Sequence, residues 1–358
     1  MSERRWMHSA AFDLGWFCGP PLLAALAVLL VPALRAPDTP VWGWLLFVVF
    51  IDVGHVYASL YRTYLDPEEF ERRRALYLYL PLAAWVAGVA LHRVSPLAFW
   101  RGFAYLAVFH FVRQQYGFLR AYARLEGPRP DWEARLDAAA IYATMLYPLV
   151  YWHADPARKF WWFVQGDFVR LNAWAGAWAG AAYAAVLSAF AARQLARLRA
   201  GLPVSPGKVG IVLSTAAAWF VGIVATNSDF AFTATNVVAH GVPYLALVWL
   251  YGRRKWADDA GWRGAFHRPA GVALFVGALL ALAYLEEGAW DLLVWKEHAA
   301  VFFGAATDWE PGPAALSLLV PLLALPQATH YLLDAWIWRF DGSNPDLGRH
   351  LLGYGPRP

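Results

Sequence analysis

Four histidines lie inside four separate hydrophobic segments of the 358-residue chain, each near the middle of a stretch long enough to cross a bilayer. They are His55, His110, His240 and His330. An ionisable side chain in hydrocarbon is costly and usually has a function there. Imidazole is also the commonest protein ligand for iron, zinc and copper. We therefore predict that these side chains bind one metal ion between membrane-spanning helices.

Polar side chains accompany the histidines at helical spacing, and positions three or four apart share one face of a helix. The neighbours that we expect to orient the imidazoles are Asp52, Gln114, Asn236 and Asp334. A metal-bound imidazole usually gives its second N–H to a carboxylate, amide or carbonyl. The two aspartates have an alternative structural role, as partners of Arg113 or Arg339. Tyr244 is expected beside an open coordination position, near O2 or substrate.

The donor set indicates which metal the site would hold. Four neutral imidazoles without a ligating carboxylate suit Fe2+ that keeps open positions for O2 or substrate, and zinc and copper are chemical alternatives. Cys18 is the only cysteine, so no thiolate cluster and no disulfide can form within the chain. We find no Gly-rich phosphate loop and no serine in a nucleophile elbow.

The composition requires a membrane environment for these histidines. The chain is 59% hydrophobic and 16% charged, whereas a soluble domain is roughly 25% charged. Its 21 Trp and 17 Tyr fit the membrane interface. Basic residues cluster in short loops, so the net charge of +4 indicates orientation in the membrane and not nucleic-acid binding. We predict an all-α, polytopic helix bundle that forms a single membrane domain over residues 1–358.

Hydropathy predicts about ten membrane-spanning helices, each near the length that a ~30 Å hydrocarbon core requires. They cover 12–34, 41–61, 76–92, 97–119, 136–152, 173–192, 209–226, 230–250, 269–285 and 314–338. The apolar stretch 292–306 is short and carries Lys296, Glu297 and His298. We expect it to be interfacial or re-entrant, and an eleventh span is the alternative.

Charge in the loops sets the orientation of these spans. With both termini in the cytoplasm, most of the 30 Lys and Arg fall in cytoplasmic segments, as the positive-inside rule requires. We expect the inner membrane of a bacterium. The second, fourth, eighth and tenth spans then run in the same direction, and their histidines lie at similar depths. The four imidazoles are therefore expected to meet at one level of the membrane.

Four sequence segments carry a resemblance to a known family. "AVFHFVRQQYG", "NVVAHGVPYLALVW", "LALPQATHYLLDAWIWR" and, least closely, "FIDVGHVYASL" occur in the matching order. This pattern resembles the Brp/Blh family of bacterial membrane β-carotene 15,15′-dioxygenases. The resemblance is at the level of motifs and covers only the four histidine-containing spans. It implies a non-haem iron centre held by histidines, and oxidative cleavage of an apolar polyene.

Carried over by position, the resemblance implies that His55, His110 and His240 are iron ligands. The family has a second histidine four residues after the one that His240 matches, and the chain has Tyr244 there. We expect His330 to take that place. Two further departures are Ser59 and Gln115, which stand where the family has aspartates.

These features predict an integral-membrane, histidine-ligated non-haem iron oxygenase. Its partners would be membrane lipids, O2 and an apolar lipid or isoprenoid/carotenoid-like substrate, and no nucleic acid. Two other classes remain open. One is a transporter or an ion- or proton-conducting protein that uses the same His and Asp residues. The other is a scaffold or assembly factor whose polar residues only join helices.

Overall fold

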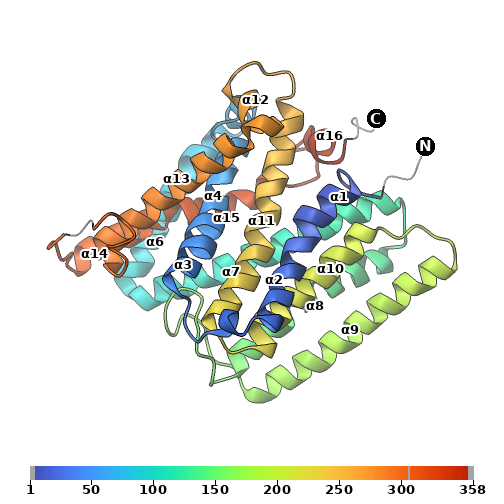
Figure 1. Ribbon diagram of the computed structural model, residues 1–358, viewed down its shortest axis with the longest axis horizontal. Helices are drawn as coiled ribbons and strands as arrows, with labels where there is room; N and C mark the ends of the chain where they lie inside the picture. Colours follow the sequence, from blue (N-terminus) through green and yellow to red (C-terminus); the bar gives the residue numbers. More distant parts are fainter. Residues whose placement is uncertain (1–4, 305–306, 354–358) are drawn as a thin grey trace.

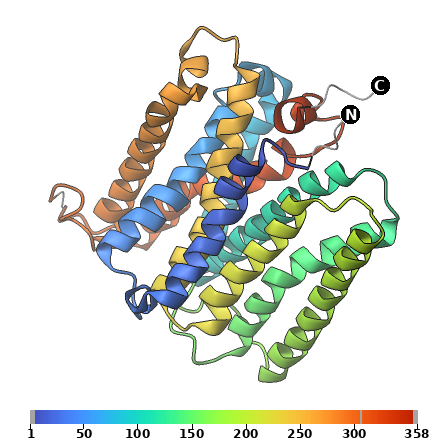
Figure 2. The same cartoon turned by 45° about the vertical axis from the view of Figure 1, so that its right-hand side comes forward.

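The computed structural model describes residues 5–304 and 307–353, and these residues form a bundle of helices without a β-strand (Figure 1). The predicted all-α fold is therefore confirmed. Figures 1 and 2 show long helices packed side by side, with α9 (Ala173–Arg199) along one edge and α13 (Val272–Trp290) along the opposite one.

Among the described residues, seven helical stretches are long and apolar enough to cross a membrane. They are Ala10–Leu30 (α1, η1 and α2), Val41–Arg62 (α3, η3, α4 and η4), Arg74–Val94 (α6), Ala173–Arg199 (α9), Pro206–Ala225 (α10 and η6), Asp229–Lys255 (α11) and Pro269–Trp295 (η7, α13 and η8). An eighth results if α14 (Pro313–Leu323) and α15 (Leu325–Ile337), which are bent by 43°, count as one span. The chain therefore has the helices of a multi-pass membrane protein.

Two more long helices occupy the predicted spans 97–119 and 136–152. These are α7 (Pro96–Ala123) and α8 (Asp131–Ala154), and neither is among the seven apolar stretches. Charged residues lower the mean hydropathy of both helices. Helix α7, for example, carries Arg101, Arg113 and Arg120. The count of ten spans thus stays a prediction. Short helices occupy connections: η2 (Pro32–Arg35), α5 (Pro67–Arg72), η5 (Arg124–Glu126), α12 (Trp262–His267) and α16 (Leu347–Leu352).

The ninth predicted span is longer than the hydropathy pattern indicated. Helix α13 continues as the π-helix η8 (Asp291–Trp295), so the apolar stretch reaches Trp295 instead of ending at residue 285. The helix stops where Lys296 adopts a left-handed conformation with φ of 57°. The segment 292–306 therefore begins within η8 and continues as turns, and its residues 305–306 lie outside the described part of the chain.

Three of the helices around the bundle centre begin at a serine that caps the first turn. The serine hydroxyl accepts a backbone N–H from the third residue of the helix, which satisfies a donor that has no partner within the helix. The caps are Ser95 for α7, Ser205 for α10 and Ser228 for α11, with O···N distances of 3.3, 3.3 and 3.0 Å. Proline follows the first two serines, where its missing N–H costs nothing.

Helix α11 is the central element of the bundle (Figure 1): 83% of the residues in its most apolar part are buried inside the protein. Glycine permits close contact with the neighbouring π-helix η3 (Trp44–Val53). A Cβ on Gly241 would lie 2.7 Å from Ile51 Cγ2 and 3.0 Å from the Ile51 carbonyl oxygen. The backbones of α11 and η3 are therefore in contact at this level, one residue from His240 and four from His55.

Buried charges join the helices at the end of the bundle where α10 begins. The Lys208 ammonium, 1% exposed, lies 2.8 Å from a Glu126 carboxylate oxygen and 3.1 Å from an Asp137 oxygen. Arg129 contacts both carboxylates. Each buried charge has a partner of opposite sign, as burial in low dielectric requires. The network fixes α10 to α8 and η5.

The first and last described segments meet on one side chain. The Arg254 guanidinium at the end of α11 donates to the Met7 carbonyl at 3.3 Å and contacts His8 Nδ1 at 3.0 Å. It also donates to the carbonyls of His350 and Leu351 at 3.2 and 2.5 Å. The two segments therefore lie at the same end of the bundle.

His267 is a buried histidine in the connection between α11 and α13. It ends α12, and its ring packs edge-on against Phe275 and beside Trp256, with ring centroids 5.4 and 4.8 Å apart. The ring fills the space left by Gly252, where a Cβ would lie 2.2 Å from His267 Cδ2. Burial lowers the pKa of His267 to about 4, despite a hydrogen bond from Nδ1 to the Arg263 carbonyl.

Candidate metal centre

The four predicted histidines come together at one point inside the bundle. Each histidine contributes one ring nitrogen, and these four nitrogens lie within 4.8 Å of one another. Each residue is 3% exposed or less. They come from four different helices: His55 from α4 (Gly54–Ala58), His110 from α7, His240 from α11 and His330 from α15. Segments separated by up to 275 residues in sequence thus build one cluster, as predicted from their spacing.

The rings form a closed circle in which each contacts two others. Ring centroids are 4.5 Å apart for His55 and His240, and 4.9 Å apart for His240 and His110. They are 4.6 Å apart for His110 and His330, and 5.0 Å apart for His330 and His55. All four contacts are edge-to-face, and one nitrogen of each ring lies near those of the other three.

The nitrogens at the centre fit a bound cation better than they fit hydrogen bonds among themselves. His240 Nε2 lies 2.9 Å from His55 Nε2 and 3.2 Å from His110 Nε2. A ring nitrogen has either one N–H or one lone pair, so His240 Nε2 cannot make an ordinary hydrogen bond to both. Two imidazole nitrogens bound at right angles to one ion, at about 2.1 Å each, lie about 3 Å apart. The observed spacing matches that arrangement.

Unsatisfied ring nitrogens give a second indication of a cation. Both ring nitrogens of His330 and the Nδ1 atoms of His55 and His240 are buried and have no hydrogen-bond partner among residues 5–304 and 307–353. A buried polar atom with no partner costs about 1–3 kcal/mol. A metal ion at the centre would give His330 a partner, so the residues present can hold a metal ion.

Asp334 and Asp52 provide carboxylates next to the outward-facing nitrogens. Asp334 Oδ2 lies 3.8 Å from His110 Nδ1, and Asp334 Oδ1 lies 3.8 Å from His330 Nδ1. Asp52 Oδ1 lies 3.6 Å from His55 Nδ1. These distances exceed those of a hydrogen bond. The structure thus brings both predicted aspartates to the cluster. Asp334 lies near His330 of its own helix and near His110 of α7.

The two predicted amides have other partners. Gln114 Nε2 donates to the His240 carbonyl at 2.9 Å, so it fixes the backbone of α11 and not an imidazole. Asn236 Nδ2 donates to the Phe232 carbonyl at 3.1 Å, within its own helix. Their oxygens, Gln114 Oε1 and Asn236 Oδ1, are buried and have no partner in the part of the chain that the structure describes. Gln115, which was not predicted, joins α7 to α11 through the Ala239 carbonyl at 2.9 Å.

Tyr244 lies against the cluster, but its hydroxyl is directed to Asp334. The phenol donates to Asp334 Oδ1 at 2.8 Å, and the Trp338 indole N–H donates to the same oxygen at 3.2 Å. The Tyr244 ring is edge-on to His330 and His55, with centroids 5.0 and 5.6 Å apart. Together these contacts fix the carboxylate that faces two of the imidazoles.

Aromatic rings that sequence reasoning missed enclose the cluster. Phe111 stacks on His240 with centroids 3.6 Å apart and an angle of 10° between planes. Tyr331 lies 4.8 Å from the His110 ring. Both directly follow a cluster histidine in the sequence, and Trp338 lies four residues after Asp334. Such spacing could have suggested them, although it does not indicate which side of the helix each ring takes.

The arginines considered as partners of the aspartates do not contact them. Arg113 Nη1 donates to the Tyr142 hydroxyl at 2.7 Å, and its guanidinium lies 4.8 Å from the Tyr116 ring centroid. The Arg339 guanidinium lies 5.6 Å from the Trp336 ring centroid. Within the described residues, neither has a carboxylate oxygen within ion-pair distance.

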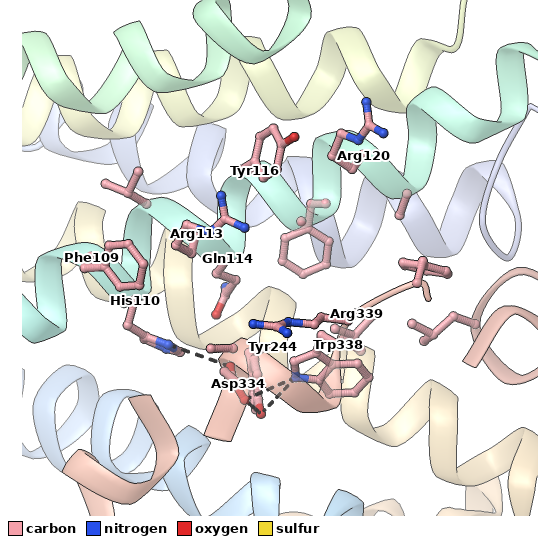
Figure 3. A pocket seen from close by; sticks show the side chains of 18 of the residues that line it. Phe109, His110, Arg113, Gln114, Tyr116, Arg120, Tyr244, Asp334, Trp338 and Arg339 are labelled. Atoms are coloured by element: carbon pink, nitrogen blue, oxygen red, sulfur yellow. Dashed lines mark hydrogen bonds and ion pairs between the residues drawn. The ribbon is translucent and has the colours of Figure 1, made fainter. Parts of the chain in front are cut away.

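A cavity of about 690 Å³ leads from the cluster toward the C-terminal end of α7 (Figure 3). His110, Tyr244 and Asp334 line one part of it, and Arg113 and Arg120 of α7 line another. Figure 3 shows His110 of α7 facing Asp334 of α15, with Tyr244 of α11 beside that carboxylate. Its size falls within the roughly 300–1,000 Å³ of small-molecule sites.

The fold and the site together define a helical, multi-pass membrane protein with a buried four-histidine cluster that could hold a metal ion. Comparison with family models, with curated proteins and with solved structures finds no match to the chain. The resemblance to the carotenoid-cleaving family therefore stays a prediction.

Proposed function

We propose that the protein is an integral-membrane, histidine-ligated non-haem iron oxygenase that oxidises an apolar lipid or isoprenoid/carotenoid-like chain. The observation that carries the proposal is the cluster itself: four buried imidazoles from four helices, with one nitrogen of each within 4.8 Å of the others. Such a cluster of ionisable rings is costly inside a membrane bundle unless they share a ligand.

Iron is the proposed metal because of the donors and their surroundings. Four neutral nitrogens leave ligand positions open, and the nearest carboxylates are 3.6 and 3.8 Å from the outward-facing ring nitrogens. Zinc and copper are the alternatives that a metal analysis distinguishes. A bound iron would supply the redox chemistry that allows O2 to oxidise a hydrocarbon.

The chain's own residues would hold the imidazoles, admit the substrate and exclude water. Asp334 is held by Tyr244 and Trp338 and would orient His110 and His330. Phe111 covers one face of the His240 ring and keeps water from it. The cavity would present an apolar chain to the His110 side of the cluster.

We further propose ten membrane-spanning helices with both termini in the cytoplasm of a bacterium, in its inner membrane. Helices α7 and α8 have 28 and 24 residues, so at 1.5 Å per residue each exceeds the ~30 Å of the hydrocarbon core. Together with the bent pair they raise the count from seven to ten. An even count agrees with the contact of the first and last described segments on Arg254.

The metal content of the purified protein tests this function. We expect about one iron per chain in the wild type and none in His110→Ala. His92→Ala is the matched control, because His92 is also buried in a membrane helix but binds Ser317, at 3.1 Å, outside the cluster. A folded wild type without metal would refute the proposal. Lipid extracts from cells with and without the gene should then differ in an oxidised apolar lipid.

The same variants separate the two rival classes. A transporter or proton-conducting protein needs polar groups distributed across the membrane, whereas these histidines share one point. Transport across proteoliposomes that is lost in His110→Ala, without an iron requirement, would favour that class. A scaffold would keep its function when all four histidines are replaced together.

A further inference from the structure

The cavity beside the cluster combines an apolar wall with an excess of positive charge. Four arginines line it, Arg113, Arg120, Arg124 and Arg339, against two aspartates, Asp334 and Asp341. Asp334 is already bound to Tyr244 and Trp338. An apolar hydrocarbon alone would gain nothing from cationic groups in its binding site, so the charge indicates a ligand with an anionic group.

Two of these arginines come to the cavity from different elements. Arg113 belongs to α7 and Arg339 follows α15, and both line the cavity. Figure 3 draws the Arg339 guanidinium beside Gln114 and the Arg113 guanidinium on the side of α7 that carries Tyr116. The hydrogen bond from Arg113 to Tyr142 and its contact with the Tyr116 ring hold its planar group in place. A guanidinium has five N–H donors, so Arg113 keeps donors for an oxyanion.

Gln114 adds an independent sign that polar ligand atoms reach this part of the cavity. Its amide nitrogen donates to the His240 carbonyl at 2.9 Å, which fixes the orientation of the amide group. Its oxygen is buried and has no partner in the described structure. A ligand hydroxyl or a protonated acid oxygen would satisfy it. Gln114 lines the same cavity as the two arginines.

The rest of the wall suits a hydrocarbon chain that enters from the lipid. Phe109 on α7 is 55% exposed and Leu146 on α8 is 48% exposed, and both line the cavity. Exposed apolar side chains at the cavity suit contact with the hydrocarbon of a membrane. Phe118 and Leu247 continue the apolar wall inside the protein.

We propose that this cavity binds a single-chain amphiphile with an oxyanion head group, a carboxylate or a phosphate. The head group is held between Arg113 and Arg339, and the apolar chain lies along Phe109 and Leu146. If the proposed oxygenase function holds, this amphiphile is the substrate class, and the anionic group fixes which carbons of the chain face His110. The site takes a charged lipid, in contrast to an uncharged polyene.

Binding of oleate and of dodecyl phosphate to the purified protein in neutral detergent tests the proposal, with oleyl alcohol and inorganic phosphate as comparison ligands. We expect Arg113→Gln and Arg339→Gln each to weaken binding of the anionic amphiphile by about tenfold, the size of one charge-assisted hydrogen bond. The matched control is Arg74→Gln. Arg74 lies outside the cavity but next to Arg73, which binds the Ser343 carbonyl, so it is at the same end of the bundle.

The comparison of ligands identifies the head group and its source. Tighter binding of oleate than of dodecyl phosphate assigns a carboxylate, and the reverse order assigns a phosphate. If inorganic phosphate binds as tightly as dodecyl phosphate, or oleyl alcohol as tightly as oleate, the amphiphile is excluded. If Arg74→Gln weakens binding of the amphiphile as much as the cavity variants do, only general surface charge acts and the proposal is overturned. If Arg113→Gln and Arg339→Gln do not weaken binding, these arginines do not hold the head group and the proposal is overturned as well.

The iron analysis keeps the two proposals separate. His110→Ala should lose iron and retain binding of the anionic amphiphile. A wild type that binds oleate through the two arginines but contains no metal would leave this site intact and end the oxygenase function. A wild type that contains iron, combined with arginine variants that bind oleate as tightly as the wild type, would leave the oxygenase function intact and overturn the amphiphile site.

Discussion

The close contact between α11 and η3 at Gly241 predicts how a single methyl group would disturb the histidine cluster. In Gly241→Ala, the added Cβ would lie 2.7 Å from Ile51 Cγ2 and 3.0 Å from the Ile51 carbonyl oxygen, whereas ordinary contacts begin at 3.4 Å. The Ile51 side chain can turn away, but its carbonyl belongs to the backbone of η3. That helix must therefore move away from α11 by about 0.4 Å or more.

A movement of this size exceeds what a metal site tolerates. His55 follows η3 directly and faces His240 at 2.9 Å between their Nε2 atoms, and metal–ligand distances are held within about 0.2 Å. We expect the affinity for Fe2+ to fall by about 10–100-fold, as for other changes that misplace a ligand. We also expect about 1–3 kcal/mol of destabilisation from overpacking.

Anaerobic titration with Fe2+ in competition with a chromophoric chelator measures the affinity, and thermal unfolding in detergent measures the stability. Gly277→Ala in α13 is the matched control, because a Cβ there meets no atom within 4 Å. Its affinity for iron should be unchanged, and its stability unchanged or higher by up to about 1 kcal/mol. If Gly241→Ala binds iron as tightly as the wild type, close packing of η3 does not position His55.

Three further changes test other parts of the structure. Asp334→Asn replaces the carboxyl group that faces His110 and His330, and iron affinity measured by the same titration should fall by about tenfold or more. Lys208→Met leaves Glu126 and Asp137 to share Arg129, so the free energy of unfolding should fall by about 1–3 kcal/mol, visible as a lower Tm; an unchanged Tm would contradict the assigned burial. Burial lowers the pKa of His267 from the ordinary 6.5 to about 4, so the unfolded chain takes up its proton first as the pH falls. Stability present above pH 6.5 is therefore lost toward pH 4, by up to about 3 kcal/mol. His267→Asn should show a smaller fall in Tm between pH 7.5 and pH 5 than the wild type, and equal falls would refute the burial of a neutral ring.

The sequence was sufficient to predict the helical class and the meeting of four histidines. Both depend on regular properties: the length of apolar stretches and the depth of His55, His110, His240 and His330 along them. The rise per residue of a helix is nearly constant, so depth can be counted from the sequence. The burial of all four side chains at one point follows from that count and from the packing of their helices.

Rotation of helices about their axes could not be predicted in the same way. Asn236 lies on the expected helix face by spacing, yet its amide nitrogen bonds to its own helix. Asp334 contacts His110 across the bundle, which depends on how α15 turns after its 43° bend. Asp52 lies in the π-helix η3, where backbone hydrogen bonds join residues five apart instead of four, so the periodicity of an α-helix does not apply.

The number of spans was the least predictable feature, for a related reason. Hydropathy averages over all faces of a helix, and α7 combines a buried face with Arg113 and Arg120, which line the cavity. A helix that borders a polar space inside a protein therefore scores as less apolar than one that faces lipid on most sides. Arg113, which belongs to the inferred ligand site, therefore also lowers the mean hydropathy by which α7 would be recognised as a membrane span.

The attachment of both Met7–His8 and His350–Leu351 to Arg254 has a consequence for biosynthesis. Translation makes residues 7–8 long before residues 350–351. Arg254 can bind the earlier segment as soon as α11 is in place, but the carbonyls of His350 and Leu351 follow only after α13, α14 and α15 have been made. The contacts of Arg254 are therefore completed late, and a chain interrupted before His350 would lack half of them.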